Sequence, residues 1–430
     1  MIIKVMRYQI IKPVDDQWET LGVVLRALQS ETQRALNRAI QLCWEYEGFS
    51  ALYKEKYDEY PKSKEILGYS GIHGYTYNKL KIECPSLNTL NLSQTLKRAC
   101  DRWKADLKEI KQGIKSIPTY KKDCPLDVDA NSVKKIEKID DKYILSISLI
   151  SKVYKKELEK KYGIFKISIK AEDDSQKHVM DRIIRGEYSL GSSQILYKNR
   201  KWFINLTYKF EAQEFSLNEN YVMGVDLGIV NTLYMAFNYC LHRYKINGNE
   251  IELFRRNVEK RRKSLQNQSK YCGKGRMGHG RKTRTTPILQ ISSKVEKFRD
   301  TCNHKYSRYV VEMALKHRCK TIQLEDLKGI AKEDMFLKNW SYYDLQEKII
   351  SKAKAIGIKV VKVNPKYTSQ RCSKCGHINK NNRIEQGKFR CINIECNFEA
   401  HADFNAARNL ATPYIDKIIE KEMRVQSNIG

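Results

Sequence analysis

The sequence has no long hydrophobic run. Its 430 residues contain no stretch of 18 or more apolar residues and no lipidation signal. Because a membrane-spanning helix needs about 20 predominantly apolar residues, we expect no membrane anchor of either kind. The first residues, MIIKVMRYQIIKP, are typical of a short strand rather than of a signal peptide. The sequence therefore predicts a cytoplasmic protein with no membrane partner.

Acidic residues are few compared with basic ones. The chain has 50 Asp and Glu against 80 Lys and Arg, so its formal net charge is +30 and its pI is near 9.5. Such a surplus is typical of proteins that bind nucleic acid, whose phosphates are anionic. An apolar fraction of 41% and a mean hydropathy of −0.61 indicate a polar but globular chain. Its length allows two or three domains.

The basic residues are densest in residues 255–284, which hold twelve Lys or Arg and a single acid, Glu259. We expect a helix here, followed by a glycine-containing loop. Two interpretations stay open: a solvated helix face, or a surface that contacts phosphates. The glycines do not form a G-x-x-x-x-G-K-[ST] loop, so a nucleotide triphosphate site is excluded there. The candidate nucleic-acid contacts in this segment are Arg255, Arg256, Arg261 and Arg262.

Closely spaced cysteine pairs are absent from most of the chain. In a cytoplasmic protein isolated cysteines are expected to be reduced and buried as small apolar residues, so a disulfide framework is excluded for them. Eight of the 12 cysteines are isolated in this way: Cys43, Cys84, Cys100, Cys124, Cys240, Cys272, Cys302 and Cys319.

The other four cysteines form two pairs, Cys372-x2-Cys375 and Cys391-x4-Cys396, separated by fifteen residues. Two thiolate pairs at this spacing are typical of a tetrahedral Zn²⁺ site, although the second pair is two residues wider than the common C-x2-C. Four thiolates close the coordination shell, so we predict one structural zinc ion. His401 is then not a ligand, and we expect it to flank a site or to cap the next helix.

The order of elements predicts a multidomain α+β protein. Strand-like segments with partial period-two alternation in residues 1–17 and 117–215 indicate a β domain, which a helical block, residues 18–116, interrupts. Within that block we expect residues 60–81, a mixture of Gly, Pro, Tyr and Lys, to form loops. The rest of the chain alternates strands and helices as in an α/β domain, and its last helix is predicted for residues 403–421.

Three carboxylates occupy unusual positions in that α/β region. Asp226 lies in the apolar strand VMGVDLG, Glu325 closes the strand TIQLEDL, and Asp403 begins the helix DFNAARN. Each alone is typical of a cap or a turn. Acids on two strands and on a helix beside the sheet can converge, however, and hold two Mg²⁺ ions about 4 Å apart for phosphodiester hydrolysis.

At this point the motifs support a resemblance. GVDLG, QLEDL, YTSQRCSKCG and HADFNAARN resemble the RuvC-type nuclease core of transposon-encoded TnpB proteins and type V CRISPR effectors. The N-terminal phrases EYPKSKEILGY, HGYTYNK and NLSQTLKRACDRWK extend the resemblance to the miniature type V-F CRISPR-associated nucleases, over nearly the whole chain.

The resemblance implies a domain layout and roles for single residues. Asp226, Glu325 and Asp403 match the catalytic, Mg²⁺-binding trio, and the two cysteine pairs match the zinc-ribbon ligands. Arg383, in the NNR turn of the ribbon, would help to place the scissile strand, and Tyr77 would help to read a motif beside the target. The implied domains are a β-barrel wedge domain (1–17 and 117–215), a helical recognition domain (18–116), an RNase H-like RuvC nuclease domain (216–370 and 400–430) and an inserted zinc-ribbon, target nucleic-acid-binding domain (371–399).

The function that the resemblance implies is RNA-guided DNA cleavage in a prokaryotic cell. The expected partners are a guide RNA, either crRNA with tracrRNA or a fused single guide, and double-stranded target DNA next to a short T-rich motif. An asymmetric homodimer on one guide RNA is also implied. Two alternatives stay open: a transposon-associated homing nuclease of the TnpB type, and a nucleic-acid-binding protein that does not cleave.

Overall fold

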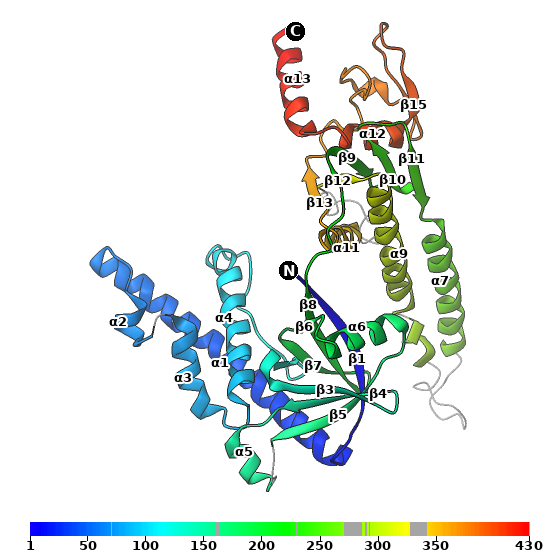
Figure 1. The fold of residues 1–430 in the computed structure, drawn as a ribbon. Helices are drawn as coiled ribbons and strands as arrows, with labels where there is room; N and C mark the ends of the chain where they lie inside the picture. The colour runs from blue at the N-terminus through cyan, green and yellow to red at the C-terminus, as the bar shows by residue number, and fades with distance from the viewer. Residues whose placement is uncertain are drawn as a thin grey trace. The chain divides into compact units, whose positions relative to one another are not determined.

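The computed structural model describes residues 1–69, 71–159, 163–228, 231–270, 286–288, 290–291, 293–326 and 342–429. The chain forms two compact units, Met1–Glu211 and Ala212–Gly430 (Figure 1). Each unit combines helices with a sheet, which confirms the expected multidomain mixture of α and β structure. None of the described helices is long and apolar enough to cross a membrane. Residues 271–284, the predicted basic loop, lie outside the described residues.

The first unit is built on an antiparallel sheet of eight strands. Its central strand β1 (Ile2–Pro13) pairs with β8 (Lys201–Phe210) along one edge and with β5 (Ile164–Lys170) along the other. Alternate residues of β8 are buried, because successive side chains of a strand point to opposite faces of the sheet. The remaining strands are β2 (Leu126–Val128), β3 (Val133–Ile139), β4 (Lys142–Ser148), β6 (Ser189–Leu190) and β7 (Ser193–Lys198).

The prediction that this sheet closes into a barrel is wrong. The strand order is β2-β7-β8-β1-β5-β4-β3, and no pairing among the described residues joins its two end strands. β2 has only three residues. The backbone then enters the 3₁₀ helix η1 (Ala130–Ser132), which the Asp129 side chain caps by accepting from the backbone N–H of Asn131, and β3 begins only after it. Because this capped turn separates the two strands, the sheet stays open.

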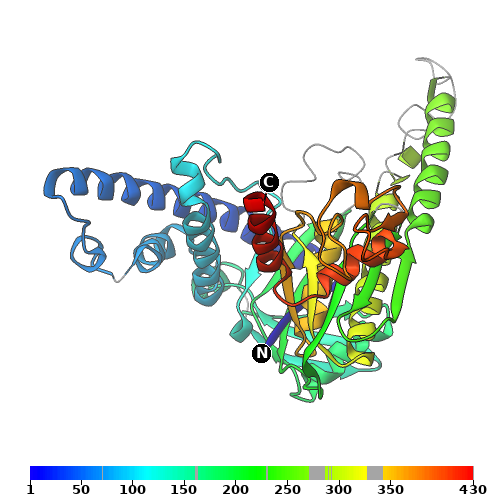
Figure 2. The ribbon, with the colours of Figure 1, turned by 90° about the horizontal axis from the view of Figure 1, so that it is seen from above.

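Helices α1 (Trp18–Tyr57) and α4 (Thr89–Lys111) pack against each other and share the hydrophobic core of the sheet. The second half of α1 extends away from the sheet as a long straight helix (Figure 2). The shorter helices of this unit are α2 (Ser63–Leu67), α3 (Ile72–Glu83), α5 (Lys152–Glu157) and α6 (Asp174–Ile184).

The expectation of loops across residues 60–81 is also wrong, because α2 and α3 lie there. Thr76 and Leu80, four residues apart on α3, are fully buried. Residues at this spacing share one helix face, and burying that face stabilises the helix by more than the roughly 1 kcal/mol that Gly74 costs in helix propensity. Tertiary packing therefore decides this segment.

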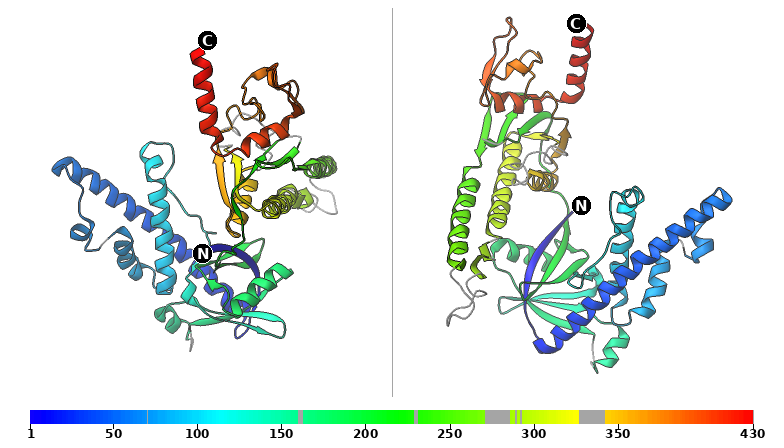
Figure 3. Two further views of the ribbon diagram at one scale, coloured as in Figure 1. Left: turned by 45° about the horizontal axis from the view of Figure 1, so that its top comes forward. Right: turned by 180° about the vertical axis from the view of Figure 1, so that it is seen from behind.

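The second unit contains a five-stranded sheet of order β11-β10-β9-β12-β13. β9 pairs antiparallel with β10 and parallel with β12, and β13 is parallel to β12. Hydrophobic side chains of the sheet pack with α9 and α11 on one face, and α12 crosses the other (Figures 1 and 3). The elements are β9 (Asn218–Asp226), β10 (Asn231–Phe237), β11 (Arg243–Asn247), α7 (Asn249–Lys270), α9 (Lys294–Lys316), β12 (Cys319–Glu325), α11 (Tyr342–Lys354), β13 (Lys359–Val363), α12 (Ala402–Leu410) and α13 (Ile415–Ile429).

The closeness of α12 to the sheet depends on Gly224. A Cβ atom at this position would lie 2.1 Å from the carbonyl oxygen of Ala407 and 2.3 Å from the backbone nitrogen of Ala411. These are backbone atoms, so no side chain could move to make room. Glycine in β9 therefore allows the helix to lie directly on the strand, which brings the first turn of α12 to the end of β9.

The single helix predicted for residues 403–421 is interrupted, since α12 ends at Leu410 and α13 begins at Ile415. Pro413 has no backbone N–H to donate within a helix, and Tyr414 adopts a left-handed conformation with φ of 56°. These two residues end one helix and start the next. A small ribbon precedes α12 and contains β14 (Lys388–Arg390), β15 (Glu399–His401) and the 3₁₀ helix η3 (Lys380–Asn382).

Candidate functional site

Two carboxylates occupy neighbouring positions at the ends of adjacent strands. Asp226 is the last residue of β9, and Glu325 is the last residue of β12. Val225 pairs with Leu324 in parallel register, so the acids that follow them are neighbours. Val225 and Leu324 belong to the core beneath α9 and α11. Since side chains alternate along a strand, both acids face the side of the sheet that α12 covers.

The third acid comes from α12. Asp403 is in the first turn of this helix, where the helix dipole favours an anion. Asn231 Nδ2 donates to Asp403 Oδ2 over 2.7 Å. His401 Nδ1 accepts from the Asp403 backbone N–H over 3.2 Å, and its ring stacks on Tyr234. The expectation that His401 caps the next helix is thereby confirmed.

The three acids and one arginine interact electrostatically. Burial raises the pKa of Asp226 well above its ordinary value, and the charges of Glu325 and Asp403 raise it further. Burial also raises the pKa of Glu325. The Thr368 hydroxyl donates to Glu325 Oε1 over 3.0 Å, and this hydrogen bond lowers the pKa in part. The guanidinium of Arg383 lowers both pKa values, so it lies within electrostatic range of the two acids. A bound cation would relieve the repulsion that remains.

This donor set fits a hard divalent cation. Mg²⁺ prefers carboxylate oxygens and keeps several of its water ligands. Among the residues that the structure describes, the carboxylate oxygens of Asp226, Glu325 and Asp403 do not form a group with all mutual distances within 4.8 Å. Carboxylates from different elements can share partly hydrated ions between them.

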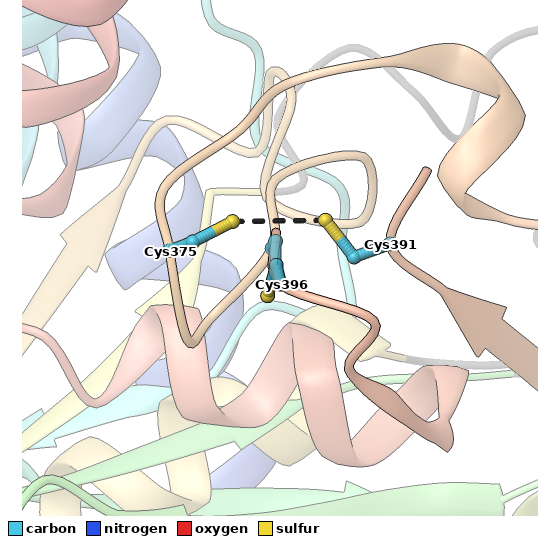
Figure 4. Close-up of side chains that lie close together, drawn as sticks. Cys375, Cys391 and Cys396 are labelled. Carbon is cyan, nitrogen blue, oxygen red and sulfur yellow. Dashed lines mark hydrogen bonds between the residues drawn. The ribbon is translucent and has the colours of Figure 1, made fainter. Parts of the chain in front are cut away.

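The four cysteines of the ribbon do form such a compact group. The Sγ atoms of Cys372 and Cys396 are 3.8 Å apart. Those of Cys375 and Cys391 are 3.6 Å apart, and Cys396 lies beside this pair (Figure 4). A disulfide would need about 2.05 Å. A tetrahedron with metal–sulfur bonds of about 2.3 Å has edges of about 3.8 Å, so the thiols are spaced for one metal ion. Burial raises the pKa of Cys391 to about 12, which disfavours its thiolate without a cation.

Buried polar side chains of α12 connect the ribbon to the acidic site, and the sequence patterns did not identify them. Asn409 Nδ2 donates to the backbone oxygens of Thr368 and Arg371 over 2.8 and 2.7 Å, and its Oδ1 accepts from Arg371 Nη1. Asn405 Nδ2 donates to the same Arg371 oxygen, and its Oδ1 accepts from the Ser373 N–H. The sequence does contain one sign of these contacts, which is the pair of asparagines four residues apart on the buried face of DFNAARN.

Comparison with known proteins now decides the family. The family model described as "Cas12f1-like, TNB domain" matches residues 342–410, which include the cysteine cluster and Asp403. The CRISPR-associated endodeoxyribonuclease Cas12f1 of Sulfoacidibacillus thermotolerans is 51% identical to this chain, over 98% of this chain and 100% of its own length. The chain belongs to the Cas12f1 family. The Cas12f1 of Syntrophomonas palmitatica is 40% identical over 84% of this chain and 80% of its own.

These relatives confirm the expected kinship with miniature CRISPR-associated nucleases. A cryo-EM structure of a Cas12f1–sgRNA–target DNA complex also has the same fold. It matches with a TM-score of 0.74 and covers 96% of this chain and 99% of the other, at 19% identity. At that identity the likeness concerns the fold alone, and it supports the mixed α/β architecture of this Cas12f1-family chain.

The four arginines predicted to contact nucleic acid have different surroundings in this Cas12f1-family chain. Arg255 and Arg256 both form ion pairs with Glu252, at 2.8 and 2.9 Å. Arg261 and Arg262 are exposed further along α7. The first two guanidinium groups therefore already have an anionic partner, while the second two present their charge to solvent.

Tyr77 and Arg383 are the other two predicted contacts. Tyr77 is half-buried on α3 and packs against the core of the first unit. Arg383 is exposed at the end of η3, and its Nη2 donates to the backbone oxygen of Gln386 over 3.2 Å. Of the two, Arg383 also acts electrostatically on the acids at the sheet end.

Proposed function

We propose that this chain is a CRISPR RNA-guided DNA endonuclease that hydrolyses phosphodiester bonds in one site formed by Asp226, Glu325 and Asp403. The convergence of these acids from β9, β12 and α12 carries the proposal, in a chain that is 51% identical over its length to a Cas12f1 endodeoxyribonuclease. The strand order, with an antiparallel trio followed by two parallel strands, supports an RNase H-like (RuvC) assignment.

In this proposal the three acids hold two Mg²⁺ ions. When bound, these ions activate water and stabilise the charge on the leaving oxygen. The chain orients the acids beforehand, because Asn231 holds one oxygen of Asp403 and Thr368 holds one oxygen of Glu325. Arg383 would bind a backbone phosphate near the acids, where its positive charge favours an anionic ligand.

The same proposal assigns one structural Zn²⁺ to Cys372, Cys375, Cys391 and Cys396. Four thiolates leave no open position for a water molecule, so the ion would fold the ribbon rather than catalyse. The contacts of Asn405 and Asn409 with the ribbon support a role in placing target DNA beside α12. Residues 371–399 would then be the target-binding insertion in a nuclease domain of residues 216–370 and 400–430.

The proposed partners are a guide RNA, in the form of crRNA with tracrRNA or a fused single guide, and double-stranded DNA next to a T-rich motif. A net charge of +30 supports this assignment. A protein guided by RNA grips nucleic-acid backbones, and base pairing reads the sequence. Residues 1–17 and 117–215 would hold the guide, residues 18–116 would form the recognition lobe, and two copies would share one guide in the prokaryotic cytoplasm.

The decisive test is cleavage by the full chain loaded with its guide RNA. Asp226→Ala should lower the rate of Mg²⁺-dependent cleavage of matched DNA by about a thousandfold or more, without changing guide or target affinity in gel-shift titrations. Glu219→Ala is the matched control, because Glu219 lies on the same strand with its side chain 78% exposed. Normal cleavage by Asp226→Ala would show that this acid is not catalytic.

The identity of the co-purifying RNA distinguishes the remaining alternatives. Spacer-containing RNA with CRISPR repeats supports the proposal, whereas RNA from a transposon end would support a homing nuclease of the TnpB type. Tight guide and target binding without Mg²⁺-dependent cleavage by the unaltered chain would instead indicate a binding protein that does not cut.

A further inference from the structure

A second compact group of metal-ligand side chains lies in the second unit, outside the ribbon and the acidic site. Cys240 and His242 belong to the turn between β10 and β11, and His317 directly follows α9. One ligand atom from each of the three lies within 4.8 Å of the other two. In the sequence, Cys240 was grouped with the isolated cysteines. Folding brings it beside two imidazoles, which are the ligands that accompany thiolates in many zinc sites.

This cluster is separate from the acidic site. β10 is antiparallel to β9, with Tyr234 opposite Asp226 and Phe237 opposite Met223. The turn after β10 therefore lies toward the beginning of β9. Cys319, two residues after His317, pairs with Asn218 at that same end. The acids lie at the opposite end of these strands, so neither site can share ligands with the other.

His317 is held in an orientation suitable for a ligand. Its ring stacks on Phe237, with centroids 4.0 Å apart. The hydroxyl of Tyr239 lies 2.9 Å from Nδ1 and that of Tyr244 lies 3.0 Å from Nε2. A metal-bound histidine keeps one nitrogen for the metal and donates its other N–H to a fixed acceptor. Metal binding would displace one tyrosine hydroxyl and leave the other as that acceptor.

The turn that carries Cys240 also contacts α12. Arg408 of α12 donates Nη1 to the Cys240 backbone oxygen over 2.8 Å. The side chain of His242 is exposed, so solvent can reach the cluster and supply a fourth ligand.

We propose that Cys240, His242 and His317 bind a second Zn²⁺ ion. A tetrahedral zinc site with nitrogen and sulfur ligands has ligand–ligand distances of about 3.4–3.6 Å, so closing the cluster needs movements of about 1 Å, within reach of side-chain rotation in a surface turn. The bound ion joins the β10–β11 turn to the end of α9. Through the Arg408 contact, the same turn touches the helix that carries Asp403.

Zinc stoichiometry of the full chain tests this proposal. Protein is stripped with a chelator, then dialysed against Zn²⁺ with excess Mg²⁺, which competes for the acids. Zinc per chain is measured by inductively coupled plasma mass spectrometry. We expect two zinc ions in the unaltered chain and one in His242→Ala. His178→Ala, which removes an exposed histidine on α6 of the other unit, should keep two.

A second measurement keeps the result interpretable if a variant folds poorly. Circular dichroism should show the same helix content for His242→Ala as for the unaltered chain, and Cys240→Ser should reproduce the loss of one zinc. Three outcomes would overturn the proposal: a single zinc in the unaltered chain, two zinc ions retained in a folded His242→Ala, or an equal loss in His178→Ala.

Discussion

At the scale of single residues, the acidic site is built at a cost to the stability of the metal-free protein. Asp226 is buried beside two partly exposed acids, Glu325 and Asp403, and its pKa is raised by burial and by their charges. A carboxyl whose folded-state pKa exceeds its unfolded value stabilises the fold only below the unfolded pKa, and this contribution is lost as the pH rises through the folded value. Ionised Asp226 therefore destabilises the metal-free protein near neutral pH.

Asp226→Asn should therefore raise the melting temperature of metal-free protein at neutral pH. The amide keeps the shape but removes the charge, and we expect an increase of about 2–4 °C, equivalent to about 1 kcal/mol for a unit of this size. Differential scanning calorimetry in the presence of a chelator measures the melting temperatures of the variant and the unaltered chain. Their difference should become smaller as the pH falls toward 3.8, the ordinary pKa of an Asp carboxyl. The control Glu219→Gln, at an exposed position on the same strand, should leave the melting temperature unchanged. If Asp226→Asn melted at a lower temperature than the unaltered chain, the proposed repulsion between the acids would be disproved.

At the scale of elements, α12 joins the ribbon to the acidic site through buried amides. Asn409 is fully buried and satisfies the Thr368 and Arg371 backbone oxygens and the Arg371 guanidinium. Asn409→Ala would remove the donor to the buried Thr368 oxygen, whereas the Arg371 oxygen keeps Asn405 and the Arg371 guanidinium keeps Glu422 as partners. A buried polar group left unpaired costs about 1–3 kcal/mol. Because Thr368 also holds Glu325, we expect both a lower melting temperature and slower cleavage in the variant.

The control for this prediction is Asn257→Ala, since Asn257 is exposed on α7. Melting curves and single-turnover cleavage rates of the two variants are compared under the same conditions. If Asn409→Ala slows cleavage at a temperature where it is fully folded, the amide positions the site as well as stabilising it. Unchanged stability would contradict the role given to this hydrogen-bond network.

Only some of these elements, and only part of the site, could be predicted from the sequence. Strand periodicity and the cysteine spacing are local patterns, so they located the strands that end in Asp226 and Glu325 and the compact cysteine group. The helix around Leu80 depends on tertiary packing, and the 3₁₀ turn after Asp129 depends on a single cap. Neither leaves a periodic signal in the sequence. The closeness of Cys240 to His317 is likewise a consequence of folding, because 76 residues separate them in the chain.

At the scale of the whole molecule, the basic side chains differ in how free they are to bind phosphate groups. Every phosphate contact releases counterions, so binding affinity falls steeply with salt, with a slope of about −0.9 per phosphate for duplex DNA and about −0.7 for single strands. Arg255 and Arg256 share Glu252 as a partner, and ion pairing already neutralises much of their charge. Arg261 and Arg262 are exposed and can approach phosphates without breaking an ion pair among the described residues.

Guide-RNA affinity measured across a range of salt concentrations should therefore separate the two pairs of arginines on α7. We expect Arg261→Ala with Arg262→Ala to reduce the magnitude of the salt slope by about 1–2, since each lost phosphate contact removes about one unit. Arg255→Ala with Arg256→Ala should reduce it by less, because binding a phosphate there requires loss of the Glu252 contact. Equal reductions would show that ion pairing within α7 does not limit phosphate binding, and no change in either variant would place the RNA contacts of this protein away from the helix.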